Sequence, residues 1–262
     1  MKVCIVGGGV MGEAILSAAL QAGVLARDSV TVVEKLPARR GQLASVYGVA
    51  VAGDFEAMAG ADAVLLSVKP QEMASVRGKL NQGAVLLSIM AGTTIASLQQ
   101  AFAHRAVVRV MPNTPAAVKA GMSAWTATPE VTADQRDFVA RLLSAIGREV
   151  YFDDEKKLDM ATAVSGSGPA YVFLFIEALV EGAVSAGLPR AAAEEMVLQT
   201  VLGSALYALE SGKSPADLRA QVTSPAGTTA AGLLALEKGA FRAAVIECVR
   251  AAHQRAIELG KA

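Results

Sequence analysis

Cysteine and histidine are both scarce in this sequence of 262 residues, which contains two of each. Cys4 and Cys248 lie near opposite ends of the chain and belong to no CxxC or CxxH pair, so neither a disulfide framework nor a zinc site is indicated. His104 and His253 lie outside every motif described below, which argues against a Ser-His-Asp triad or a metal cluster. We therefore expect no metal site and a protein of the reducing cytoplasm.

An excess of charge of either sign is also missing. Lysine and arginine together number 24, and aspartate and glutamate together also number 24. The sequence therefore lacks the basic surface that binds phosphate backbones without regard to sequence. We expect no nucleic-acid partner.

Long uninterrupted apolar runs are absent as well, although 53% of the residues are hydrophobic. The apolar stretch YVFLFIEALVEGAVSAGL carries Glu177 and Glu181, and no run approaches the roughly 18 apolar residues that a spanning helix needs. The apolar start after Lys2 is short, broken by glycines and followed by Glu13, so we interpret it as a strand and not as a signal peptide. The sequence predicts no membrane segment.

The chain is longer than a usual single domain, and its two halves show different patterns. In the first half, short apolar runs alternate with helix-like segments, which favours a parallel sheet with right-handed crossovers. The expected strands are Val3 to Val6, Val30 to Glu34, Ala63 to Val68, Val85 to Ile89, Val107 to Val110 and a last one near Glu149 to Phe152. This pattern predicts a Rossmann domain, a doubly wound α/β fold, over residues 1–152.

The second half, residues 153–262, shows no strand pattern. The charged run after Phe152 is typical of a solvated helix start. Prolines that suit a first helical turn and glycines that suit helix ends follow along the chain. We expect this second domain to be all-α.

A glycine motif follows the first expected strand. Gly7, Gly9 and Gly12 form GxGxxG, which permits a tight turn, close approach of a pyrophosphate and close packing of helix on strand. The helix start then presents free N–H groups to the anion. Glu34 follows at roughly the spacing of the acidic residue that contacts the adenosine ribose. Motif and context together predict dinucleotide binding, in preference to a glycine-rich turn without a ligand.

The residues after the second expected strand leave the choice of dinucleotide open. Glu34 would bind the ribose hydroxyls of NADH and repel the extra phosphate of NADPH. Lys35, Arg39 and Arg40 follow it, and they would either accept that phosphate or simply form the solvated first turn of the next helix. We therefore expect NADPH or NADH as the cofactor.

Polar loops follow two further strands. The segments LLSVKPQEM and LLSIMAGTT place Ser67, Lys69, Pro70, Ala91 and Gly92 just past the carboxyl ends of apolar runs, where open α/β sheets bind ligands. Ordinary loop chemistry explains these positions equally well. Two other loops, RVMPNTPA and VSGSGP, concentrate Pro, Gly, Asn and Ser, and their rigidity would suit the wall of a site.

The helical half contains one hydroxyl-rich loop, TSPAGTT, at residues 223–229. We expect Thr228 or Thr229 to cap a helix that starts near Ala230. A hydroxyl-rich helix start is also suited to binding a carboxylate. Capping alone would account for one of these threonines, so position by itself does not establish a binding site.

Six segments in order make the chain similar to the pyrroline-5-carboxylate reductases over essentially its whole length. These segments are GGGVMGEAI, SVKPQEM, AGTT, RVMPNTPA, SGSGPAYVF and TSPAGTTAAGL. The resemblance implies an NAD(P)H-dependent oxidoreductase of proline biosynthesis that acts on a C=N bond. It also implies a Rossmann domain followed by an all-helical domain that interlocks with a second subunit, and hence a homodimer or a higher homo-oligomer.

The resemblance also implies site residues. The implied cofactor contacts are Gly7, Gly8, Gly9, Val10, Met11, Gly12, Ser67, Val68, Lys69, Pro70 and Ala91. The implied substrate site comprises Ser224, Gly227, Thr228 and Thr229, with the Thr229 hydroxyl near the imine nitrogen as the catalytic group.

Three positions depart from the family pattern. Ser67 and Ala226 replace a commoner alanine and glycine, and Glu34 is less typical of the end of the second strand. Alanine has less backbone freedom than glycine, so Ala226 bears on the geometry of the substrate loop. Glu34 keeps the use of NADH open.

Two alternative functions require other features. A related imine or β-hydroxyacid reductase should carry a lysine or an acid on the long helix after SGSGP, where this chain has Tyr171, Phe173 and Phe175. A noncatalytic dinucleotide-sensing module would need no substrate loop. The predicted function is reduction of 1-pyrroline-5-carboxylate to L-proline, in which the dinucleotide carries the chemistry and the protein positions the reactants.

Overall fold

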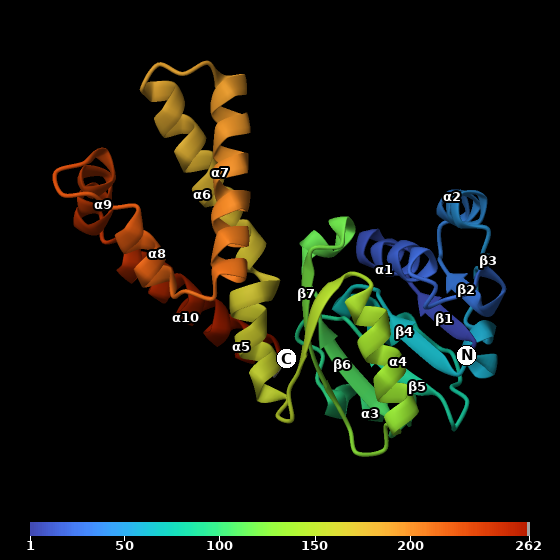
Figure 1. Cartoon of the computed structure of the whole chain (residues 1–262). Coiled ribbons are helices and arrows are strands. Elements are labelled where there is room, and N and C mark those ends of the chain that lie inside the picture. Colours follow the sequence, from blue (N-terminus) through green and yellow to red (C-terminus); the bar gives the residue numbers. More distant parts are fainter. Residues whose placement is uncertain (261–262) are drawn as a thin grey trace. The chain divides into compact units, whose positions relative to one another are not determined.

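The computed structural model describes residues 1–260 and divides into two compact units (Figure 1). The first unit comprises Met1–Pro169 and the segment that begins at Ala251, and the second comprises Ala170–Arg250. The last strand ends at Tyr151, beside the boundary expected after residue 152, whereas the first unit continues to Pro169. The division into domains at residue 152 therefore stays a prediction.

One eight-stranded sheet forms the framework of the first unit, with strand order β3-β2-β1-β4-β5-β6-β7-β8. All neighbouring strands are parallel except β6 and β7, which pair antiparallel. The order reverses at β1, which lies between β2 and β4, so a crevice is expected at the carboxyl ends of these strands. The strands are β1 (Val3–Val6), β2 (Val30–Val33), β3 (Ala50–Ala52), β4 (Ala63–Leu66), β5 (Val85–Ser88), β6 (Val107–Met111), β7 (Gly121–Ala127) and β8 (Gly147–Tyr151).

Alternating side chains of the strands form two apolar cores, one on each face of the sheet. Ile5 belongs to the core that contains residues of α1, α2 and α4, whereas its neighbour Val6 belongs to the core that contains a residue of α3. Strands buried on both faces are expected to be almost wholly apolar, as β1 and β4 are. The helices of this part are α1 (Val10–Gln21), α2 (Pro37–Tyr47), α3 (Ile95–Phe102) and α4 (Ala133–Ser144), with the 3-10 turns η1 (Arg27–Ser29), η2 (Glu56–Gly60), η3 (Pro70–Ser75) and η4 (Thr114–Val118). The predicted Rossmann fold is confirmed.

Two strands were not expected from the sequence. β3 has three residues that are not fully buried, and β7 mixes glycine, serine and threonine with apolar residues, so neither shows a strong strand pattern. β7 is antiparallel to β6, so the predicted parallel sheet contains one antiparallel pair of neighbouring strands. The expected strands are all present, with ends that differ by one or two residues.

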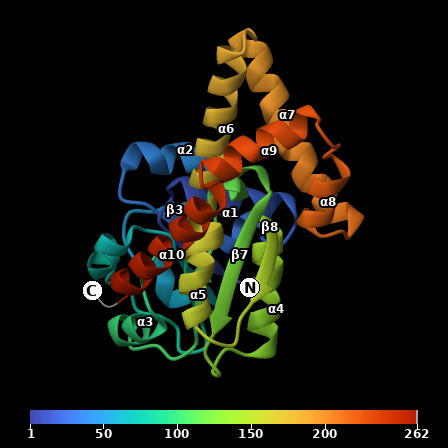
Figure 2. The ribbon, with the colours of Figure 1, turned by 90° about the vertical axis from the view of Figure 1, so that its left-hand side faces the viewer.

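Beyond Tyr151, the described chain contains helices and no strand. α6 and α7 run side by side as an antiparallel pair (Figures 1 and 2) and pack through Val180, Ala193 and Val197. The helices are α5 (Lys156–Ala161), α6 (Gly168–Ser185), α7 (Arg190–Ser211), α8 (Pro215–Gln221), α9 (Thr228–Lys238) and α10 (Phe241–Leu259), and a π-helical turn, η5 (Thr162–Gly166), lies between α5 and α6. The prediction of an all-α second half is confirmed.

The helices of the second unit leave much apolar surface exposed. Phe173, Leu202 and Ile246 are each more than half exposed. The run Lys156–Ser185 is also long and apolar enough, by length and composition, to cross a membrane. A helix that packs inside a soluble protein meets the same criteria. The expected absence of a membrane segment therefore stays a prediction.

Candidate functional site

A glycine-rich loop connects β1 to α1 and is built against the end of β4. Gly7 has a φ of +104°, and a Cβ there would lie 2.8 Å from the carbonyl oxygen of Ser67. A Cβ on Gly12 would collide with the carbonyl oxygen of Gly7. The hydroxyl of Ser67 lies 2.6 Å from that same oxygen and fastens the loop to β4. Gly7 and Gly12 therefore serve the tight turn and the close helix packing that the motif predicts.

The N-terminus of α1 is open to a ligand. Gly9 is its N-cap residue, and no side chain caps the helix. A Cβ on Gly9 would meet no atom within 4 Å, so the backbone there can be approached closely. Uncapped amides at the positive end of a helix bind anions, and a pyrophosphate fits this position.

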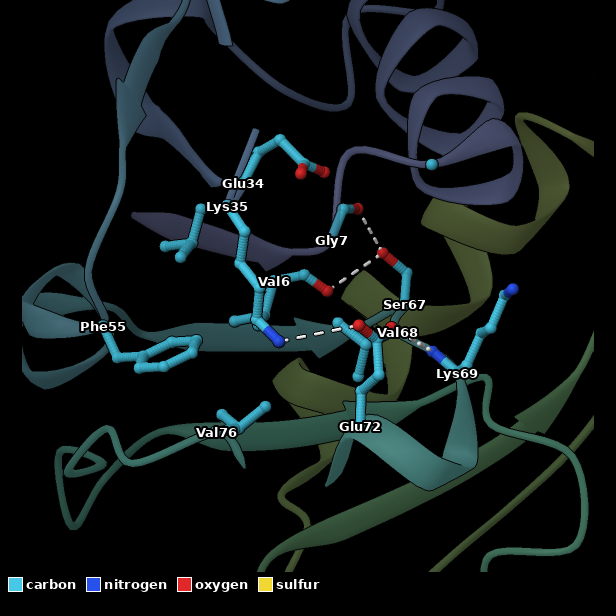
Figure 3. Close-up of a pocket in the computed structure, with 12 residues that line it drawn as sticks. Val6, Gly7, Glu34, Lys35, Phe55, Ser67, Val68, Lys69, Glu72 and Val76 are labelled. Carbon is cyan, nitrogen blue, oxygen red and sulfur yellow. Dashed lines mark hydrogen bonds and ion pairs between the residues drawn. The ribbon is translucent and has the colours of Figure 1, made fainter. Parts of the chain in front are cut away.

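The loop borders a pocket at the carboxyl ends of β1, β2 and β4, where the strand order reverses (Figure 3). The lining combines an apolar wall with charged groups and comprises Val6, Gly7, Gly9, Val33, Glu34, Lys35, Phe55, Ser67, Val68, Lys69, Glu72 and Val76. Doubly wound sheets bind dinucleotides at such a switch point. The apolar wall, the open helix start and the carboxylate of Glu34 fit a base, a pyrophosphate and a ribose.

The structure brings half of the predicted cofactor contacts into this lining, namely Gly7, Gly9, Glu34, Ser67, Val68 and Lys69. The others lie outside it: Gly8, Val10, Met11 and Gly12 in the loop and the first turn of α1, Pro70 at the start of η3, and Ala91 after β5. The contact of each residue with a cofactor stays a prediction.

Apart from Val6 and Val33 at the ends of expected strands, three lining residues were not expected from the sequence. Phe55 follows β3, the short strand that the apolar pattern did not reveal. Glu72 and Val76 lie within and just after η3. Only Glu72 lay in a segment already singled out, SVKPQEM, so the other two had no sequence signal.

Glu34 is held at the rim of the pocket by two backbone amides. Its Oε2 accepts the N–H of Gly8 at 3.0 Å, and its Oε1 accepts the N–H of Leu36 at 3.0 Å. Lys35 extends across the pocket toward Glu72 (Figure 3), with 3.5 Å between Nζ and Oε1. The rim therefore carries a fixed carboxylate and a cation that already has a partner.

A buried arginine fastens α5 to the sheet. Arg109 of β6 is 5% exposed, and its two terminal nitrogens lie 2.9 Å from carboxylate oxygens of Glu155 and Asp159. Glu155 also accepts the N–H of Ile95 at the start of α3, at 2.8 Å. A guanidinium withdrawn from water requires such partners. No local pattern indicates this cluster, because Arg109 lies in an otherwise apolar strand.

The two polar loops RVMPNTPA and VSGSGP meet in the first unit. The amide of Asn113 donates to the carbonyl oxygen and the hydroxyl of Ser165, each at 3.2 Å. Its Oδ1 accepts the N–H of Met122 at 2.8 Å. Ser165 lies in the π-helical turn η5, and such turns are frequent at functional sites. The role of the two loops as the wall of a site stays a prediction.

The TSPAGTT loop of the second unit ends at the N-terminus of α9. This helix begins at Thr228, with Gly227 as its N-cap and no side-chain cap. The expected cap by Thr228 or Thr229 is therefore wrong, because both threonines already lie in the first helical turn. Ala226 has a φ of +61°, a left-handed conformation that costs an alanine roughly 1–2 kcal/mol. Among the described residues, neither threonine hydroxyl makes a hydrogen bond.

The chain matches two family models. Residues 2–92 match the model described as NADP oxidoreductase, coenzyme F420-dependent. Residues 155–259 match the model described as pyrroline-5-carboxylate reductase dimerisation. The first match covers the glycine loop and the pocket, and the second covers the helices from α5 to α10.

Three relatives match nearly the whole chain. A pyrroline-5-carboxylate reductase from Synechocystis sp. is 46% identical over 100% of this chain and 99% of its own length. The solved structure of one from Coxiella burnetii, 33% identical, has a TM-score of 0.90 and covers 100% of this chain and 99% of its own. A pyrroline carboxylate reductase from Plasmodium falciparum with NADP bound, 28% identical, has a TM-score of 0.87 over 99% and 98%. By its sequence over the full length, the chain belongs to the pyrroline-5-carboxylate reductase family, as its motifs predicted.

Proposed function

We propose that the chain reduces the cyclic imine of 1-pyrroline-5-carboxylate to L-proline with a hydride from NAD(P)H. The observation that carries the proposal is the 46% identity, along the whole chain, to a relative named for this reaction. The pocket at the switch point supports the proposal, because a dinucleotide bound there would supply the hydride and the protein would only have to orient the dinucleotide and the substrate.

The first unit offers groups for the pyrophosphate and for the adenosine ribose of the dinucleotide. The open start of α1 at Gly9 would bind the pyrophosphate, and the carboxylate of Glu34 would accept hydroxyls of the adenosine ribose. Ser67 keeps the glycine loop in shape, and Lys69 adds positive charge to the lining. When bound, the cofactor supplies the hydride.

The start of α9 would bind the substrate. Uncapped amides at the N-terminus of this 11-residue helix attract a carboxylate, and Ser224, Gly227 and Thr228 surround them. Within residues 1–260 the Thr229 hydroxyl has no hydrogen-bond partner, and it would hydrogen-bond the imine nitrogen, the atom that gains a proton in the reaction. Thr228 is exposed, which suits a contact with the substrate carboxylate. Thr229 is half-buried, which suits a contact with the imine nitrogen.

The helical unit would dimerise with a second copy of the chain, in the cytoplasm. An apolar groove of about 450 Å³ is lined by Tyr171, Leu174, Phe175, Ala178, Leu179, Leu236, Phe241, Ala244, Val245 and Cys248. Burial of such a surface by association is favoured, and the region matches a dimerisation model. Both cysteines are free thiols, which suits a reducing compartment.

Oxidation of NADH and NADPH on addition of 1-pyrroline-5-carboxylate tests the function, followed by the absorbance of the reduced nicotinamide. We expect turnover and chromatographic identification of L-proline as the product. A β-hydroxyacid and an unrelated cyclic imine serve as control substrates. Faster turnover of either control would indicate a related reductase, and dinucleotide binding without any turnover would indicate a noncatalytic sensor.

A further inference from the structure

The charged groups that follow β2 bear on whether the site accepts a phosphate on the adenosine ribose. The two backbone bonds to Glu34 fix its carboxylate and use one acceptor position on each oxygen. An ionised carboxylate has about four such positions, so Glu34 retains acceptors for ribose hydroxyls. It has no hydrogen to donate and cannot bind a phosphate.

All three nitrogens of Arg39 donate to protein acceptors. Arg39 donates from Nε to the carbonyl oxygen of Gly8 at 2.8 Å, from Nη1 to Gln42 at 2.7 Å and from Nη2 to Glu13 at 2.5 Å. Glu13 in turn accepts the hydroxyl of Tyr47 at 2.9 Å. The hydrogen bond from Arg39 holds the pKa of Glu13 below its usual value, so Glu13 stays ionised at neutral pH and keeps its hold on Arg39.

The other two cations after β2 are engaged as well. Arg40 donates from Nη1 to the backbone carbonyl oxygens of Glu34 and Lys35, at 2.7 and 2.9 Å, and so braces the end of β2. Lys35 binds the hydroxyl of Ser75 at 3.0 Å and pairs with Glu72 on the η3 side of the pocket. The cluster of bases that suggested a phosphate site in the sequence therefore serves the fold.

We propose that the chain prefers NADH to NADPH and that two carboxylates set this preference, Glu34 at the ribose and Glu13 through its hold on Arg39. The inference deepens the proposed function and rests on its dinucleotide site. A phosphate carrying nearly two negative charges meets the Glu34 carboxylate at this rim, while the guanidinium of Arg39 is held by Glu13 and that of Arg40 by backbone carbonyls. The Plasmodium falciparum relative with NADP bound shows that the family fold accommodates the phosphate, so discrimination lies in the side chains at this rim.

Binding of each dinucleotide, measured by titration calorimetry without substrate, tests the wild-type chain directly. We expect NADH to bind about tenfold or more tightly than NADPH at low ionic strength. The ratio of kcat/KM for the two cofactors in imine reduction should follow the binding ratio. Equal or tighter binding of NADPH by the wild type would overturn the proposal, and this test needs no variant that has to fold.

Two isosteric variants assign the preference to its residues. Glu34→Gln keeps the shape and one carbonyl acceptor but removes the charge, so the ratio of dissociation constants for NADPH and NADH should fall severalfold. Glu13→Gln releases Arg39 from its ion pair and should tighten NADPH binding while NADH binding stays close to wild type. Glu130→Gln is the matched control, because it removes one negative charge from an exposed loop of the same unit. If the ratio of dissociation constants for NADPH and NADH in both variants equals that of Glu130→Gln, the two carboxylates do not set the preference.

The outcomes separate this inference from the proposed function. A chain that binds NADH in preference and reduces no pyrroline-5-carboxylate would sustain the inference and contradict the function. A chain that reduces the imine efficiently but binds NADPH at least as tightly would contradict the inference alone.

Discussion

The two units of the chain bury their apolar residues very differently. In the first unit, cores on both faces of the sheet leave side chains such as Ile5 and Leu86 almost completely inaccessible. In the second unit, the described chain has one small cluster of buried residues, Val180, Ala193 and Val197. The first unit is therefore complete within one chain, whereas the second requires another surface to cover its helices.

The charges of the two units follow the same division. Arg109 and Arg39 of the first unit are mostly buried and bridge elements distant in sequence. The ion pair between Arg190 and Glu181 in the second unit is more than half exposed and joins neighbouring helices. Exposed pairs contribute little to stability, typically less than about 1 kcal/mol. Association, and not internal electrostatics, is expected to stabilise the helical unit.

The largest effect is expected from a charge placed in the apolar groove. Leu174→Asp puts a carboxylate on a surface that dimer formation would remove from water, at a cost of several kcal/mol. Sedimentation velocity should show a monomer at micromolar concentration, with most of the reductase activity lost. NADH binding by the first unit should persist, which would sharpen the contrast between the two units.

Val46→Asp provides the matched control for the groove. Val46 lies on α2 of the first unit and is 62% exposed, so a charge there requires no desolvation. Its sedimentation and activity should match the wild type. A Leu174→Asp chain that remains a fully active dimer would show that the groove is not the interface.

The sequence predicted the first unit well because burial on both faces makes its strands nearly uniformly apolar. The glycine motif was equally informative, since Gly7 and Gly12 meet steric demands that other residues cannot meet. The pattern failed for β3, which is too short to show a period, and for β7, whose composition is mixed. The sequence therefore predicts those elements whose residues form a regular local pattern, such as an apolar run or a glycine motif.

The parts of the site that the sequence could not predict depend on distant contacts. Arg109 pairs with Glu155, 46 positions away, and Arg39 pairs with Glu13, 26 positions away. Neither pairing leaves a local pattern in the sequence. The sequence therefore suggested that the bases after β2 bind a phosphate, whereas the structure shows them hydrogen-bonded to protein groups. The start of α9 was misplaced for a different, local reason, because Gly227 takes the N-cap position that hydroxyl residues usually fill.

A smaller effect, on rate, is expected in the helical unit at Thr229. Thr229→Ala should lower kcat and kcat/KM together by about tenfold or more if the hydroxyl acts at the imine nitrogen in the transition state. Thr229→Ser should recover much of the rate, and binding of the dinucleotide should be unchanged in both variants. Steady-state kinetics with saturating cofactor measures these effects.

Thr228→Ala is the neighbouring control. It removes a hydroxyl from the same helical turn and should chiefly raise KM, because Thr228 is proposed to help hold the carboxylate. Since neither threonine caps α9, both alanine variants should keep nearly wild-type stability. If Thr228→Ala and Thr229→Ala both change kcat only slightly and by the same factor, Thr229 is not a catalytic residue.

The smallest expected effect is a pH-dependent part of the stability of the first unit. The hydrogen bond from Arg39 lowers the pKa of Glu13 in the folded chain from its usual value of 4.5. A carboxylate with a lowered folded pKa stabilises the fold at pH values above its unfolded pKa, and that contribution is lost as the pH falls through the folded pKa. Because Glu13 is 28% exposed, the contribution should be about 1 kcal/mol or less at neutral pH.

Denaturant unfolding of the wild type and of Glu13→Gln at neutral pH and at successively lower pH values below the usual pKa of 4.5 measures this contribution. Glu13→Gln should be the less stable chain at neutral pH, and the difference in free energy of unfolding should shrink on acidification, because the wild-type carboxylate becomes protonated and loses its ion pair with Arg39. Glu181→Gln removes the exposed carboxylate of the helical unit and should leave the wild-type pH dependence intact. A difference between the wild type and Glu13→Gln that stays constant with pH would mean that the carboxylate acts through its shape and hydrogen bonds alone, and the electrostatic contrast between the two units would then fail at this residue.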